Sequence, residues 1–113
     1  MKLVNNSTGE VLAGRIDTAN SFMSRLTGLM GKKEMPDGYA LLLKPCSQIH
    51  TFFMKFSIDV IFLDRNWTAR HIIENMLPWR ISPFVPGAKF AAELPGGKLK
   101  NRVSPGDILK LEE

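Results

Sequence analysis

The sequence has very little cysteine and histidine: Cys46 is the single cysteine among 113 residues, and there are two histidines. One cysteine cannot form an internal disulfide, and one thiol is too few for a cysteine-based zinc site. We therefore expect the fold to depend on an apolar core. The redox state of the compartment is left open.

Long apolar runs are also missing. No segment approaches the roughly 20 apolar residues that cross a bilayer as a helix, and the first ten residues, MKLVNNSTGE, lack the apolar core of a signal peptide. We therefore expect no membrane span. For the chain as given we expect a cytoplasmic location, or an extracytoplasmic one if a leader has been removed.

The positive charge is not concentrated. The net charge is +4, but the fifteen Lys and Arg residues are spread from Lys2 to Lys110. A nucleic-acid footprint is usually a concentrated basic patch, so we predict a solvated surface and no nucleic-acid partner. With 44% hydrophobic and 23% charged residues the chain has an ordinary globular composition. Its length suits a single domain, residues 1–113, with one core.

Frequent turn signals divide the chain into short segments. One early segment has the pattern of a helix, at about residues 18–30: Thr18 or Asn20 could cap it, and Phe22, Leu26 and Met30 would form its inner face. Without helices between successive strands, a parallel α/β fold is excluded. We predict a mainly β fold, a jelly-roll-like sandwich or a partly open barrel. The predicted strands cover residues 2–5, 10–16, 39–43, 49–54, 58–63, 67–75, 88–94 and 108–111.

Two ionisable residues, His50 and Asp59, stand among the apolar residues of the predicted strands. A buried ionisable group needs a partner, and Asp59 could find one in His50, Arg25, Arg80 or the backbone amides of the turn at residues 55–57. A His50–Asp59 pair could act as acid and base near neutral pH. Alternatively, Asp59 caps a turn in a structural network and His50 is a core residue.

Metal and thiol chemistry have weaker support. His50 and His71, with Asp59 or Glu93, could provide the two nitrogens and one carboxylate that non-haem iron uses. However, no ligand pair has close spacing, so we predict no metal and no other cofactor. Cys46 could pair with His50 as a nucleophile, but free cysteines are usually buried, and we expect an inert thiol.

A proline-rich loop follows the predicted strand at residues 67–75. It carries Trp79, Arg80 and Phe84. Flat apolar side chains beside a planar cation suit stacking on a sugar or on a partner's aromatic groups. The alternative is that these side chains fold back as a lid over one end of the sandwich.

Five segments cover nearly the whole chain in order: RLTGLMGKKEMPDG (25–38), IHTFFMKFSIDVIFLD (49–64), ENMLPWRISP (74–83), AAELPGG (91–97) and SPGD (104–107). Together they resemble the domain of unknown function 192 (DUF192) family of bacteria and archaea. The resemblance implies a mainly β, jelly-roll-like fold and no known activity, cofactor or catalytic residue. The resemblance implies that Asp59 corresponds to the typical aspartate of the family's strand motif. At the position of His50, other members of the family have a tryptophan.

No motif in the sequence identifies a reaction, so we predict a kind of site and not an activity. We predict a small soluble binding or accessory domain with a polar pocket, and Arg25 and Asp59 as members of a structural network. The ligand would be a small polar molecule, such as a carbohydrate, or a protein segment. One alternative is a hydrolase-like, metal-assisted enzyme using His50 and Asp59; another is a domain that contacts proteins through an exposed edge strand. The predicted pocket residues are His50, Met54, Asp59, Trp79, Arg80 and Glu93.

Overall fold

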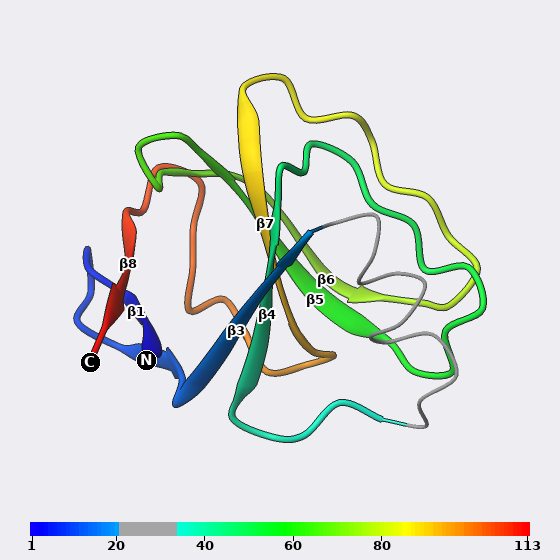
Figure 1. Ribbon diagram of the computed structural model, residues 1–113, viewed down its shortest axis with the longest axis horizontal. Helices are drawn as coiled ribbons and strands as arrows, with labels where there is room; N and C mark the ends of the chain where they lie inside the picture. The colour runs from blue at the N-terminus through cyan, green and yellow to red at the C-terminus, as the bar shows by residue number, and fades with distance from the viewer. Residues whose placement is uncertain (21–33) are drawn as a thin grey trace.

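The computed structural model describes residues 1–20 and 34–113, and within those residues it contains eight β-strands and no helix (Figure 1). The fold is therefore mainly β, as predicted. The strands are β1 (Lys2–Asn5), β2 (Val11–Ala13), β3 (Arg15–Asn20), β4 (Tyr39–Lys44), β5 (Ile58–Asp64), β6 (Ala69–Met76), β7 (Ala88–Pro95) and β8 (Leu109–Glu112).

The strands form two sheets that do not close into a barrel. The larger sheet has the order β3-β4-β7-β5-β6 and the smaller one the order β2-β1-β8. All pairs are antiparallel except β3 with β4, which run parallel. The first and last strands pair with each other, so both termini lie at one end of the molecule (Figure 1). The finer jelly-roll assignment stays a prediction.

Three predicted elements differ from the structure. The predicted strand at residues 10–16 is divided at Gly14 between β2 of the smaller sheet and β3 of the larger one. Thr18–Asn20, the predicted start of the helix, instead continue strand β3 and pair with residues 42–44 of β4, because the ladder hydrogen bonds outweigh the weak capping preference. The rest of that predicted helix, with Arg25, lies outside the described residues. The predicted strand at 49–54 is wrong: the segment forms turns, with an isolated bridge from His50 to Ile81.

The larger sheet is buried on both faces. One face packs against the smaller sheet in a first core that includes Leu3, Ile61 and Leu99. The other face forms a second core with residues of two long loops, 45–57 and 77–87. Strands that are buried on both faces are apolar at successive positions rather than alternating, which explains the run in β5. The two loops thus cover the second core, just as the described strands of the smaller sheet cover the first core.

Residues 104–107 form a type II turn. Gly106 has a φ of 96°, and the Asp107 amide donates to the Ser104 carbonyl. The Asp107 carboxylate accepts bonds from the Ser104 amide and from the buried Asn5 side chain, both at 2.9 Å, and these bonds lower its pKa. This contribution to stability is present above the unfolded-state pKa and is lost as the pH falls through the lowered folded-state pKa.

Candidate functional site

Asp59 is fully buried and accepts three backbone hydrogen bonds. Its Oδ1 accepts the amide of Asn75 at 2.8 Å and that of Gly97 at 3.0 Å, and its Oδ2 accepts the amide of Leu99 at 2.8 Å. Three amides provide the hydrogen bonds that a buried carboxylate needs. They come from the end of β6 and from the turn after β7, so Asp59 joins three segments that are distant in sequence.

The turn that Asp59 holds leaves no room for a side chain at Gly96. A Cβ atom there would meet the Ser57 hydroxyl and would lie 3.1 Å from both the Ser57 carbonyl carbon and the Asn75 Oδ1. The turn must therefore keep its glycine for close approach.

A Gly96→Ala substitution should lower the free energy of unfolding by about 1–3 kcal/mol, because the added methyl group forces backbone apart in a packed region. Gly14→Ala is the matched control: a Cβ there would have no heavy atom within 4 Å, and we expect a change within about 0.5 kcal/mol. Urea denaturation of both variants measures the difference. Equal stabilities would contradict the packing seen at Gly96.

The structure does not bring the six predicted pocket residues together. Asp59 pairs with Leu94 and faces the first core, on the same side of β5 as Ile61 and Leu63. Glu93 pairs with Leu41 and Val60, so it faces the second core, where Met54 also lies. The sheet itself separates Asp59 from Glu93. Both carboxylates and Met54 are buried.

His50, Trp79 and Arg80 lie together on the loop side, away from Asp59. His50 is half-buried; its ring stacks on Phe52, with 4.7 Å between centroids, and its Nδ1 accepts the Phe52 amide at 3.3 Å. All hydrogen bonds described for Asp59 go to backbone amides, so Asp59 does not orient His50. The acid–base pair of the hydrolase hypothesis is therefore not formed.

Thr51 holds the two loops together. It is fully buried, and its Oγ1 donates to the Leu77 carbonyl at 2.6 Å and accepts the Arg80 amide at 2.9 Å. Its backbone accepts the amides of Trp79 and Met54 and donates to the Arg80 carbonyl. One threonine thus satisfies backbone groups on both loops, which loop segments over a core require. Nothing in the sequence pattern singles out Thr51 for this role.

The loops held by Thr51 present aromatic side chains to solvent. Phe53 and Trp79 are 62% and 55% exposed, and their ring centroids are 4.7 Å apart. Both have left-handed backbone, with φ angles of 65° and 62°, which is uncommon for bulky residues. The loop that carries Trp79 has three more exposed apolar residues, at positions 77, 81 and 84. We call this set the aromatic surface: Phe53, Leu77, Trp79, Ile81 and Phe84.

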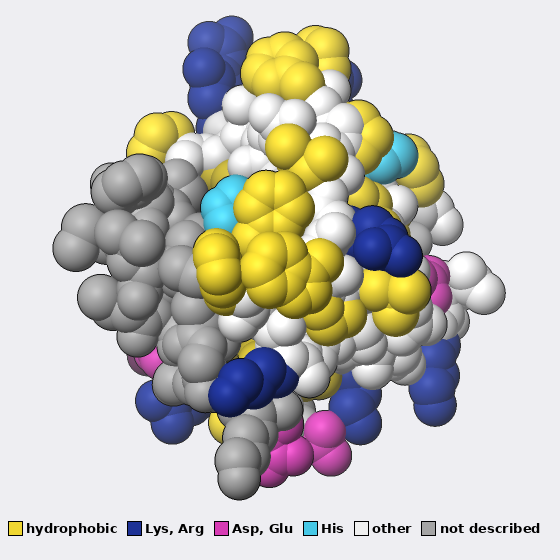
Figure 2. Space-filling view, turned by 90° about the vertical axis from the view of Figure 1, so that its right-hand side faces the viewer, with side chains coloured by type: hydrophobic (Ala, Val, Ile, Leu, Met, Phe, Trp, Pro, Cys, Tyr) yellow, Lys and Arg dark blue, Asp and Glu magenta, His cyan; other side chains and the backbone are white. Residues whose placement is uncertain are grey.

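Figure 2 shows this side of the molecule, with hydrophobic side chains gathered near its centre and a histidine at their edge. Lysine and arginine side chains lie around them, and acidic side chains lie farther away. The predicted lid does not account for this arrangement, because the aromatic side chains of Trp79 and Phe84 are more than half exposed. Exposed apolar side chains gathered in this way are typical of a contact region.

Below the aromatic surface, buried polar groups fix the loop backbone. Ser82 is buried, and its Oγ accepts the Ile49 amide at 3.0 Å while donating to the Pro83 carbonyl at 2.9 Å. Cys46 is buried, as predicted, and its Sγ lies 3.4 Å from the Gln48 carbonyl oxygen. These contacts belong to the support of the loops.

The described residues hold no group of three or more His, Cys, Asp or Glu side chains arranged to bind a metal ion. His71 is half-buried on β6 and lies with its ring centroid 6.2 Å from that of Phe62. In the same residues no helix is long and apolar enough to span a membrane.

Two proteins with similar sequences come from archaea. The chain is 39% identical to a UPF0127 protein of Thermococcus sibiricus, over 84% of this chain and 64% of the relative, so it spans less than two thirds of that protein. It is 38% identical to a UPF0127 protein of Pyrococcus horikoshii, over 96% of each chain. These names assign no activity.

A solved structure shares the fold. A protein of unknown function from Novosphingobium aromaticivorans superposes with a TM-score of 0.79, over 97% of this chain and 82% of that one, at 19% sequence identity. The model of the DUF192 family, described as "Uncharacterized ACR", matches residues 3–111. The chain therefore belongs to the DUF192 family, whose function is uncharacterised.

Proposed function

We propose that the chain is a single binding domain that recognises an apolar segment of a partner protein through its aromatic surface. The observation that carries the proposal is the pair Phe53 and Trp79, held exposed on left-handed backbone by Thr51. Uncommon backbone conformations persist where the surrounding structure enforces them, and they concentrate at functional sites. Exposed tryptophan and phenylalanine are typical anchors of protein interfaces.

A protein segment fits this surface better than a carbohydrate does. A sugar needs several hydrogen-bonding groups near the ring on which it stacks. Here the hydroxyls of Thr51 and Ser82 are already bonded to the loop backbone. The five side chains of the aromatic surface are all apolar, and Phe53 and Trp79 are tilted by 59°, so they form a ridge rather than a platform.

Charge favours an acidic flank on the bound segment. Arg80 follows Trp79 and Lys55 lies two residues after Phe53; both side chains are exposed. The chain as a whole carries a net charge of +4. Complementary charges at the rim of an interface speed association and select partners. The proposed partner segment therefore combines aromatic or aliphatic residues with aspartate or glutamate.

A displayed library of random peptides tests the proposal directly. Selection on the wild-type protein should enrich peptides with apolar residues next to acidic ones. Trp79→Ala should then weaken the binding of a selected peptide by about ten- to a hundredfold, because anchor residues contribute most of the affinity. Titration calorimetry measures this loss. Ile108→Ala is the matched control, because Ile108 is 46% exposed but lies next to the smaller sheet.

Three results would overturn the proposal. Peptides that bind wild type and Trp79→Ala equally would show that the aromatic surface is not used. A glycan array signal that depends on Trp79, with no enriched peptide, would show that the ligand is a sugar and not a protein segment. A dimer that dissociates on Trp79→Ala substitution would show that a second copy of the chain occupies the surface.

A further inference from the structure

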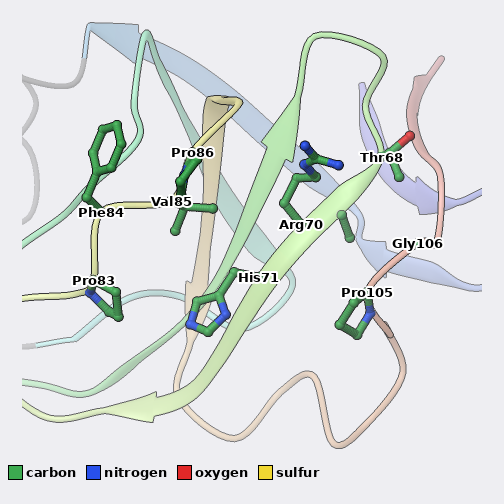
Figure 3. Close-up of a pocket in the computed structure, with 10 residues that line it drawn as sticks. Thr68, Arg70, His71, Pro83, Phe84, Val85, Pro86, Pro105 and Gly106 are labelled. Atoms are coloured by element: carbon green, nitrogen blue, oxygen red, sulfur yellow. The ribbon is translucent and has the colours of Figure 1, made fainter.

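A separate cleft lies beside the first half of β6 (Figure 3). It has a volume of about 460 Å³ and is lined by residues 68–71, 83–86 and 105–106. In Figure 3, Arg70 and His71 stand on β6 between the loop residues Pro83–Pro86 on one side and Pro105 with Gly106 on the other. The volume is in the range of small-molecule sites.

A β-bulge explains why both Arg70 and His71 line this cleft. Leu63 of β5 pairs with Ala69, and Phe62 pairs with His71, so Arg70 is an extra residue on β6. In a regular strand, consecutive side chains point to opposite faces of the sheet. A bulge redirects a side chain, and bulges are over-represented next to active sites. Here the bulge gives one cleft two neighbouring nitrogen-bearing side chains.

The Arg70 side chain is held on one side by Asp64 and is accessible to a ligand on the other. Its Nε lies 3.9 Å from the Oδ2 of Asp64, whose Oδ1 accepts the amides of Asn66 and Thr68. A Cβ atom at Gly87 would lie 3.0 Å from the Arg70 Nη2, so this glycine leaves space for the guanidinium. The Arg70 side chain is 51% exposed. Among the described residues, the terminal nitrogens of Arg70 and the ring nitrogens of His71 have no hydrogen-bond partner.

The walls of the cleft are apolar and stiff. Pro83, Pro86 and Pro105 have rings that fix the backbone φ angle, and Phe84 and Val85 lie between the first two prolines. Rigid apolar walls around a few polar groups bind a ligand with little loss of entropy.

We propose that this cleft binds a small organic carboxylate with an apolar body. The Arg70 guanidinium would hold the carboxylate in a bidentate manner, which its planar fork favours, and His71 would donate a further hydrogen bond. The apolar body would pack against the proline walls. The site does not depend on the partner-protein interface of the preceding subsection, although Phe84 belongs to both regions.

Benzoate is the probe, with benzamide as its neutral counterpart of similar shape and inorganic phosphate as an anion without an apolar body. Amide chemical shifts of the intact protein are followed by NMR during titration with each compound. Benzoate should give saturable shifts at residues 68–71, 83–86 and 105–106, with an affinity about tenfold higher than benzamide or phosphate.

Two substitutions test the role of the guanidinium. Arg70→Gln should weaken benzoate binding about tenfold or more, and Arg70→Lys should recover part of it, because lysine keeps the charge but not the fork. Arg65→Gln is the control, since Arg65 is exposed on the same hairpin but does not line this cleft. The amide spectrum of each variant shows whether it is folded.

The proposal is overturned by any of four outcomes. Benzoate shifts that do not saturate would show that no site exists. Equal affinities for benzoate and benzamide would show that the cleft does not recognise the carboxylate group. Unchanged benzoate affinity in folded Arg70→Gln would show that Arg70 does not bind the carboxylate. Tighter binding of phosphate than of benzoate would show that the cleft binds inorganic anions.

Discussion

Replacing Asp59 with alanine should lower the free energy of unfolding by about 3–5 kcal/mol, a large share of the 5–15 kcal/mol typical of a whole domain. The amides of Asn75, Gly97 and Leu99 would lose their common acceptor. The Leu99 amide is bonded in a buried setting, where an unsatisfied donor keeps its full desolvation cost. Urea denaturation at neutral pH measures the change.

Asp59→Asn and Asp37→Ala complete this experiment. The asparagine amide group cannot accept a bond at the place of one carboxylate oxygen, so Asp59→Asn should cost less than alanine, about 1–3 kcal/mol. Asp37, 83% exposed in its side chain and paired with Lys98, should change stability by less than about 1 kcal/mol when replaced by alanine. If Asp59→Ala cost no more than Asp37→Ala, Asp59 would not be the anchor of these turns.

Replacing Thr51 with valine should lower stability by about 2–3 kcal/mol and loosen the aromatic surface. Valine keeps the shape of threonine but has no hydroxyl, so the Leu77 carbonyl and the Arg80 amide lose their partner. Hydrogen exchange gives a local readout: the Arg80 amide, bonded to the Thr51 hydroxyl, should exchange faster. The Trp79 amide, bonded to the Thr51 main chain, should change less.

Thr51→Ser is the control for this substitution, because serine retains the hydroxyl. It should restore slow exchange at Arg80, and it should keep most of the binding to a peptide selected on the aromatic surface. Arg80 protection that is the same in valine, serine and wild type would show that the hydroxyl does not hold the loops.

The sequence predicts the strands better than it predicts the loops. Alternation places Asp59 on the face of Ile61 and Leu63, and this is confirmed. The apolar run at residues 49–54 suggested a strand, yet Ile49 and Met54 are apolar because their loop covers the second core. Short apolar runs do not reveal whether the backbone is extended or merely packed.

The partners of the site residues could not be predicted for a related reason. Asp59 bonds to amides 16, 38 and 40 residues away, and backbone amides leave no signature in the side-chain sequence. Thr51 had no signal beyond its place in an apolar run. The bulge at Arg70 depends on the register of β5 with β6, which is a property of the pair of strands and not of either one. The sequence left open whether Trp79 is exposed or folds back as a lid, and in the structure it is exposed.

The pairing of β1 with β8 has a practical consequence. Lys2 lies opposite Glu112, and both chain ends are at the left of Figure 1, whereas the aromatic surface belongs to the loops at the right. A short linker could join the two ends without crossing either core, so a circularly permuted chain, opened elsewhere, should retain its fold. For the same reason, a protein immobilised through a tag at either end would present Phe53 and Trp79 to the solution.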